Sequence, residues 1–150
     1  MATAAGAVRT AFKSMMVTAI ADTAVQVEVG YPWPQTSADI VSVGRVVVGL
    51  EPGPMGPQRQ RVETITVEVL ISVFRPGGQE QEEIASARAY ELLDAVEHHT
   101  RMVDQTLGGL VQSCLLTGHE LDSAPFSDDT GQGRTVEVLA TFEAKNRVRN

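Results

Sequence analysis

One segment of the chain alternates so strictly that any fold of it must contain a β-sheet. Residues 64–74 read TITVEVLISVF, and successive side chains of a strand point to opposite faces of its sheet. One face of the predicted strand is aliphatic (Ile65, Val67, Val69, Ile71, Val73) and the other is mostly polar (Thr64, Thr66, Glu68, Ser72). Leu70 and Phe74 interrupt the polar face, which indicates that the far end of this second face is also covered, by a helix, a loop or a neighbouring subunit.

Four other segments predict strands of the same sheet. Residues 25–29 and 134–145 alternate small or apolar residues with polar ones. Residues 42–50 hold three consecutive valines between glycines, and residues 110–118 follow a pair of glycines. Residues 127–133 are rich in Ser, Asp and Gly, which are typical of turns. The last two strands are therefore expected to form a long hairpin.

Two segments have the periodicity of helices. In residues 4–21, apolar side chains recur at steps of three and four residues, which places them on one stripe. Residues 79–102 follow a strand-ending Pro-Gly-Gly and open with three glutamates, which suit the positive end of a helix dipole. The stripes consist of Val8, Ala11, Phe12, Met15, Ala19 and Ile20 in the first helix and Ala85, Ala89, Leu92, Leu93 and Val96 in the second.

The order of these elements, α-β-β-β-α-β-β, determines the expected fold. Hairpins on both sides of the second helix favour an α+β fold with a single mixed, largely antiparallel β-sheet and two α-helices packed on one face. A length of 150 residues is typical of one domain, so we expect a single domain over residues 1–150.

Charge and composition argue against several classes of protein. The 19 acidic and 12 basic residues give a net charge of −7, which is unfavourable for binding phosphate backbones, so specific nucleic-acid binding is not expected. No apolar stretch approaches the ~20 residues that span a bilayer, so no membrane association is expected. Residues 15–21 follow Arg9 and Lys13 and superficially resemble a signal peptide, but they fit an amphipathic helix better.

The candidate chemical residues do not form a reactive set. His98 and His99 are adjacent and point about 100° apart on a helix, so an interaction with the helix end is favoured over a metal site. Cys114, the only cysteine, is five residues from His119. On a strand, that separation is about 16 Å with side chains on opposite faces, so a buried structural thiol is favoured over a nucleophile.

Acidic and glycine-rich segments likewise lack the spacing of known sites. Glu120, Asp122, Asp128 and Asp129 do not match a calcium-binding loop and favour a solvated acidic turn. The glycines at 108–109 and 131–133 lack the residues of a phosphate-binding loop. We therefore predict no enzymatic activity and no catalytic, metal or cofactor-binding residue.

Two segments favour contact with a partner. Tyr31 and Trp33 lie among prolines in an irregular segment, and such aromatic residues are enriched at interfaces, although a loop folded over its own core is the alternative. The Pro- and Gly-rich segment 51–61 reads as a projecting loop, either a partner contact or a solvated hairpin. The candidate interface residues are Tyr31, Trp33, Gln58, Arg59, Arg61, Leu70 and Phe74.

With these elements in place, the chain resembles the tail-terminator family of long-tailed bacteriophages, in particular the forms found in phages of actinobacteria. The resemblance covers nearly the whole chain and depends on patterns rather than on catalytic motifs. It is carried by the helix from Val8 to Ala21, the strand Glu63-Thr64-Ile65-Thr66-Val67-Glu68-Val69, the alanine-rich helix from Glu83 to Glu97, the segment Thr106-Leu107-Gly108-Gly109 and the strand from Thr135 to Lys145. The segment containing Tyr31 and Trp33 matches no part of this pattern.

The resemblance implies a structural virion protein that forms a homo-oligomer, a hexameric ring, at the head-proximal end of a phage tail. Such a ring ends polymerisation of the tail-tube protein and offers a surface to a neck or head-completion protein. The implied location is the tail–neck junction of the virion, with assembly in the host cytoplasm. The alternatives are another head–tail joining or tail-completion protein and, from a different class, a small cytosolic ligand-binding domain or enzyme.

Overall fold

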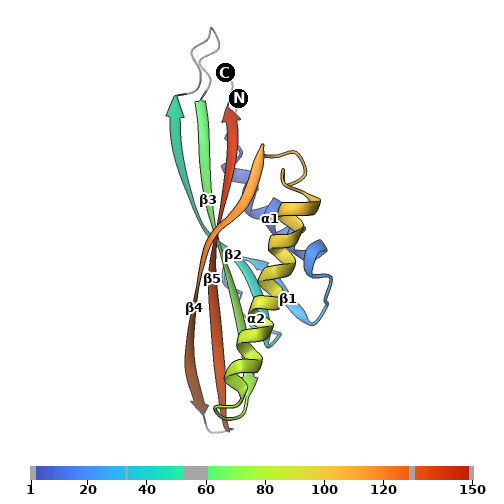
Figure 1. Ribbon diagram of the computed structural model, residues 1–150, viewed down its shortest axis with the longest axis vertical. Helices are drawn as coiled ribbons and strands as arrows, with labels where there is room; N and C mark the ends of the chain where they lie inside the picture. Colours follow the sequence, from blue (N-terminus) through green and yellow to red (C-terminus); the bar gives the residue numbers. More distant parts are fainter. Residues whose placement is uncertain (1–2, 33, 53–60, 129–130, 149–150) are drawn as a thin grey trace.

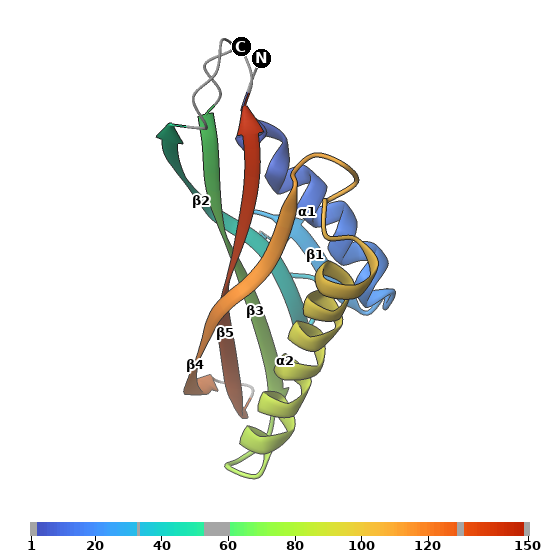
Figure 2. The ribbon, with the colours of Figure 1, turned by 45° about the horizontal axis from the view of Figure 1, so that its top comes forward.

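The computed structural model describes residues 3–32, 34–52, 61–128 and 131–148. Within them, two helices cover one face of a five-stranded sheet (Figures 1 and 2), which confirms the predicted α+β fold and element order. The elements are α1 (Ala5–Ile20), β1 (Val25–Val29), β2 (Asp39–Pro52), β3 (Arg61–Pro76), α2 (Gln81–His98), the π-helical turn η1 (His99–Val103), β4 (Ser113–Asp128) and β5 (Gly131–Val148).

The sheet has the strand order β1-β2-β3-β5-β4. β1 runs parallel to β2, and the other three pairings are antiparallel. β1 pairs with β2 only at residues 39–43, so the outer side of β2 beyond Val43 has no strand neighbour among the described residues. The β2–β3 and β4–β5 hairpins extend in opposite directions along the long axis of the molecule (Figure 1).

The core lies between the helices and the face of the sheet that the alternation predicts to be apolar. All five aliphatic residues of that face of β3 are fully buried, as are residues 136, 138, 140, 142 and 144 of β5. Phe12 of α1 packs edge-on against Phe142 of β5, with ring centroids 5.0 Å apart. Because burial contributes roughly 25 cal/mol per Å² of apolar surface, this layer is the main source of stability.

The residues that the two helices bury agree with the predicted apolar stripes, apart from small differences. The five predicted stripe residues of α2 are buried, and so are Val8, Phe12 and Met15 of α1. Ala11, Ala19 and Ile20 are only partly buried but pack against the core. Met16, which was not assigned to the stripe, is fully buried as well, so the buried stripe of α1 is wider than predicted.

None of the described residues forms a helix on the second face of the sheet, called here the open face. The chain between β1 and β2 covers one end of this face. Pro32 is buried, and Ile40 and Ser42, whose side chains point to the open face, are almost fully buried. Leu70 and Phe74 are half-buried. The cover inferred from those two residues thus includes a loop of the same chain.

Several strands are longer than predicted, and β4 differs most. β4 was expected at 110–118 and spans 113–128, because residues 119–128, which lie beyond the predicted strand, pair with residues 131–140 of β5. A bulge between Leu116 and Gly118 shifts the alternation by one residue. β2, expected at 42–50, spans 39–52, and β5, expected at 134–145, spans 131–148.

The second helix begins two residues later than predicted and changes its geometry near its end. α2 runs from Gln81 to His98 and continues into the π-helical turn η1. The expectation that His98 and His99 lie at a helix end therefore applies to α2 alone, since the helical backbone continues to Val103.

Glu63 is a buried acid that alternation alone did not predict, and it anchors the start of α1 to the sheet. Its carboxylate accepts hydrogen bonds from Thr3 Oγ1 (2.5 Å), the Ala4 amide (2.8 Å) and Asn146 Nδ2 (2.8 Å). Burial raises the pKa of Glu63, but these hydrogen bonds outweigh burial and hold its pKa below the ordinary value.

Glu63→Gln is expected to lower the free energy of unfolding at neutral pH by about 2 kcal/mol. The NH₂ group of the glutamine would face hydrogen-bond donors from which the carboxylate now accepts hydrogen bonds, and it cannot accept them. The lowered pKa means that the contribution of Glu63 is present above its ordinary pKa and is lost as the pH falls through the folded-state value. Urea unfolding at neutral and acidic pH measures this difference, with Glu68→Gln on the open face as the control. An equal loss in both variants, or one that persists in acid, would contradict the assignment.

Candidate functional site

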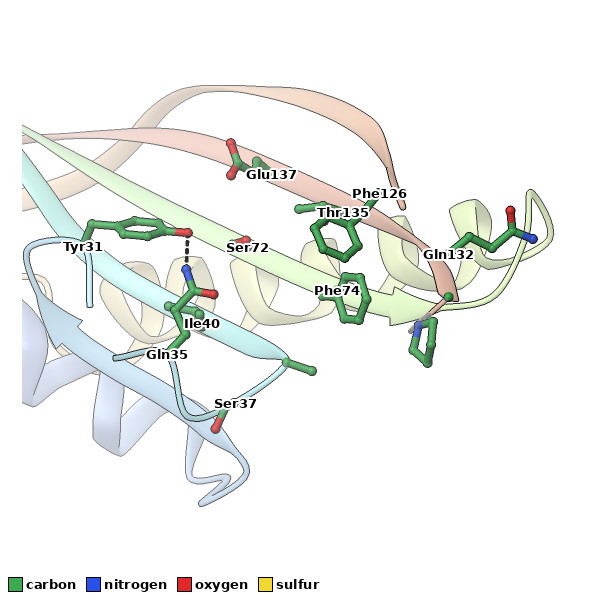
Figure 3. A pocket seen from close by; sticks show the side chains of 13 residues that line it. Tyr31, Gln35, Ser37, Ile40, Ser72, Phe74, Phe126, Gln132, Thr135 and Glu137 are labelled. Atoms are coloured by element: carbon green, nitrogen blue, oxygen red, sulfur yellow. Dashed lines mark hydrogen bonds between the residues drawn. The ribbon is translucent and has the colours of Figure 1, made fainter. Parts of the chain in front are cut away.

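A groove lies on the open face of the sheet. Its walls come from three parts of the chain: Tyr31 and Gln35 after β1, Phe74 near the end of β3, and Phe126 near the end of β4. The sheet supplies the floor, and the cavity volume is about 450 Å³. Figure 3 shows Tyr31 and Gln35 on one side of this floor and the two phenylalanines at its other end.

Aromatic packing shapes one end of the groove. The rings of Phe74 and Phe126 meet edge to face, with centroids 5.6 Å apart. A Cβ atom at Gly133 would lie 2.6 Å from the Phe74 ring, so only glycine at this position lets the ring lie against β5. At the other end, Gln35 Nε2 donates a 2.6 Å hydrogen bond to Tyr31 Oη. Tyr31 and Phe126 remain about half exposed, which leaves aromatic surface available to a partner.

The sheet beside the groove is acidic. Asp122 of β4 and Glu137 of β5 are directly opposite each other in the strand register, and both are exposed on the open face. Like charges placed opposite each other on a sheet repel, so this pair favours a ligand or partner that brings a positive charge or a hydrogen-bond donor. Glu120, the next open-face residue along β4, extends the negative surface.

The structure brings together only part of the predicted interface set. Tyr31 and Phe74 line the same groove, and Leu70 lies on the same face, half-buried. Arg61 is exposed at the start of β3, about 40 Å along the strand from Phe74. Trp33, Gln58 and Arg59 lie outside the described residues.

The prediction that Cys114 and His119 point to opposite faces is wrong. Cys114 is opposite Ala144 and His119 is opposite Ala140, two residues of the same face, because the bulge after Leu116 inserts an extra residue. The two side chains remain about 13 Å apart along the strand. His119 Nδ1 lies 3.2 Å from the Tyr90 hydroxyl.

Cys114 is buried, as predicted for a structural thiol. Burial, with a smaller contribution from Asp104, raises the pKa of its thiol to about 12. A thiol with this pKa stays protonated near neutral pH, and only the thiolate is a strong nucleophile. Cys114 is therefore inert packing in the core.

The acidic segment that was predicted to be a solvated turn lies mostly in a strand. Asp128 closes β4 in the hairpin rather than lying in a separate turn, and Asp129 lies outside the described part of the chain. Among residues 3–32, 34–52, 61–128 and 131–148, no group of three or more His, Cys, Asp or Glu could hold a metal ion. Neither helix in these ranges is long and apolar enough to cross a membrane.

Exposed apolar residues gather at two free edges of the sheet, and sequence reasoning did not single them out. Val47, Val48 and Leu50 lie on the part of β2 beyond β1, and Leu115 lies on β4, the opposite edge strand. Phe126 was also missed, because its segment lay outside the predicted strands. The runs of valine and leucine in 46–50 and 114–116 are visible signals, but alone they only predict strands and do not assign them to an edge.

No protein-family model and no curated protein matches the sequence. Among solved structures, the fold is similar to that of a chain in the virion of a native gene transfer agent particle, with 14% sequence identity and a TM-score of 0.41 over 97% of this chain and 100% of that chain. A second solved chain, whose description states no function, shares 17% identity with a TM-score of 0.42 over 91% of this chain and 92% of that chain.

Proposed function

We propose that this chain is a structural virion protein that acts as a ring-forming tail terminator of a long-tailed phage or phage-like particle. Its role is to end polymerisation of the tail tube and to offer a surface to a neck or head-completion protein. The proposal combines the sequence resemblance with one structural observation: apolar and aromatic side chains are exposed on two edge strands and on the open face of the sheet.

The distribution of exposed apolar residues supports an assembly role. Strand edges with unpaired amides and carbonyls are ready templates for another chain, and proteins that remain single usually protect them. A closed ring of identical subunits uses two different patches on each subunit. The free segment of β2 and the start of β4 supply two such patches on opposite sides of one molecule.

The negative charge is compatible with this role. With a net charge of −7 and exposed acids such as Asp122 and Glu137 on the open face, the subunit does not attract phosphate backbones. A ring of such subunits stands beside passing DNA without binding it.

Another head–tail joining or tail-completion protein is the nearest alternative, since the same surfaces suit it. A ligand-binding domain is the second candidate, favoured by the groove: about 450 Å³ is within the range of small-molecule sites, and its lining mixes aromatic and polar side chains. The groove lies between the exposed side chains of Tyr31 and Phe126, however, which suits a segment of a partner protein better than an enclosed small molecule.

Native mass measurement over a range of concentrations tests the proposal. A sixfold species, or a monomer that becomes sixfold on added tail tubes, supports the terminator. A monomer that stays single with tubes present and retains a small molecule supports the ligand-binding alternative. Electron microscopy separates the joining-protein alternative, which requires the subunit on the head side of the neck.

Charge reversal at Arg59 and Arg61 is expected to weaken docking to the adjoining tail or neck protein about 10-fold or more without changing the melting temperature. Arg61 is exposed at the start of β3, and Arg59 precedes it in the sequence. Pull-down of the adjoining protein measures the effect, and Lys13→Glu on α1 is the control. Unchanged docking would remove this end of the molecule from the interface.

A further inference from the structure

We infer that the free segment of β2 (Val46–Leu50) and the start of β4 (Ser113–Leu116) are the two halves of one interface, which joins each copy of this chain to the next. The inference rests on the proposed ring and identifies the surfaces that would form it. We call these segments the β2 edge and the β4 edge.

The two edges lie at the same level of the sheet and on opposite sides of it. Val47 pairs with Thr66, Thr66 with Glu143, and Glu143 with Leu115. Because directly paired residues point to the same face, Val47 and Leu115 occupy one row and both point to the open face. Figure 1 shows β2 and β4 as the outer strands of this part of the sheet.

The directions of the strands suit pairing between copies that are related by rotation. The antiparallel pairings β2–β3, β3–β5 and β5–β4 make β2 and β4 run in opposite directions. A rotation about an axis roughly parallel to the strands keeps every copy in the same orientation. The β2 edge of one copy then meets the β4 edge of the next in an antiparallel arrangement, which continues the ladder of hydrogen bonds.

Among the described residues, these two segments of the sheet border lack the charges and prolines that usually protect a strand edge from pairing. β1 is only five residues long and carries Glu28. The remainder of β4 contains the charged Glu120 and Asp122 and also Pro125, which blocks a ladder hydrogen bond. The β2 edge reads VVVGL and the β4 edge SCLL, without a charge or a proline.

Exposed apolar side chains line both edges. On the β2 edge, Val47 is 44% and Leu50 56% exposed; on the other side, Leu115 of β4 is 49% and Met102 of η1 62% exposed. η1 contacts β4, and Val103 beside Met102 is equally exposed. Pairing of the edges brings these two apolar groups together, which removes both from water.

Charges beside the edges add complementarity. Arg45, exposed at the bulge just before the β2 edge, is positive. Glu120, exposed after the bulge of β4, is negative. In the antiparallel arrangement both lie toward the same end of the paired edges, with Glu120 in the row of Ser42, so the two charges attract each other across the contact between copies.

Three double variants test the interface. Val47→Lys with Leu50→Lys disables the β2 edge, and Met102→Lys with Leu115→Lys disables the β4 side. Val17→Lys with Ile84→Lys, at helix residues of 51% and 52% exposure, is the matched control. Sedimentation of the full-length chain should show self-association at least about 100-fold weaker in the first two variants and unchanged in the control.

Mixing the two edge variants gives the sharper result. The β2-edge variant keeps its β4 edge and the β4-side variant keeps its β2 edge, so the mixture is expected to form a one-to-one dimer that neither variant forms alone. As a second measurement, a variant with both Val47→Cys and Leu115→Cys should form disulfide-linked chains of subunits under oxidation, whereas each single cysteine variant should not.

The outcomes separate this inference from the proposed function. Rings that persist in both edge variants, or a mixture that does not dimerise while the unmodified chain assembles, overturn the interface but leave the ring. Edge-dependent assembly into open filaments supports the interface and contradicts the closed ring. A chain that stays monomeric at every concentration and with tail tubes present overturns both.

Discussion

Val69→Asp is expected to abolish soluble, folded protein. Val69 is fully buried between Val43 of β2 and Ala140 of β5, in the middle of the face that packs against the helices. A carboxylate at this position would be unpaired in an apolar layer, which costs more than about 4 kcal/mol and approaches the whole stability of a typical domain. Soluble yield and circular dichroism after expression measure the result.

Thr66→Asp is the control, because it introduces the same charge on the same strand. Thr66 points to the open face and is half-buried, so its variant should fold with only a small loss of stability. Normal folding of Val69→Asp would show that the assignment of faces to β3 is wrong, since a register shift of one residue exchanges the two faces.

Asp39→Ala is expected to destabilise the protein by about 3 kcal/mol. The Asp39 side chain, 10% exposed, lies 2.5 Å from Arg75 Nη1 and 2.8 Å from Arg88 Nε. It thereby links the start of β2 to the end of β3 and to α2. Removing the carboxylate leaves two guanidinium groups, each mostly buried, without their shared partner.

The same network predicts a dependence on pH. Burial raises the pKa of Asp39, but hydrogen bonds and charges from Arg75 and Arg88 outweigh it and lower the pKa below the ordinary value. The contribution of Asp39 is therefore present above its ordinary pKa and is lost as the pH falls through the lowered one. Thermal unfolding of the native chain and Asp39→Ala should differ at neutral pH and converge in acid.

Asp22→Ala is the matched control, because Asp22 also pairs with Arg88, at 2.9 Å, but is 42% exposed. Its removal should have a much smaller effect, since exposed ion pairs are screened by water. A comparable loss in both variants would show that Arg88, rather than the buried carboxylate, dominates the cluster.

The parts of the fold that could be predicted from sequence are the strands with one solvent-exposed face and one buried face. β3 and β5 alternate because each has such a pair of faces, and the alternation identifies which residues form the core. In β1 the alternation identifies the core only in part, since Val25 is buried but Val29 is exposed. The second half of β4 could not be predicted in this way. It is an edge strand whose residues 117–127 are exposed, and the bulge after Leu116 changes its alternation.

The buried acids Glu63 and Asp39 and the candidate groove depend on contacts between residues that are far apart in the sequence. Glu63 bonds residues 60 and 83 positions away, and Asp39 bonds Arg88, 49 positions away, so no local pattern marks either acid as buried. Tyr31 and Phe74 were singled out separately, but their meeting in one groove depends on the path of the chain over β2. Phe126 joins them only because the β4–β5 hairpin extends to Asp128.

Electron microscopy of tail tubes incubated with the purified protein tests the central claim most directly. The account predicts a sixfold ring of this subunit at one end of each tube, with its sheets joined edge to edge, and tubes that no longer elongate. Tubes that continue to grow without bound protein, while the chain remains a monomer with a small molecule in its open-face groove, would contradict it.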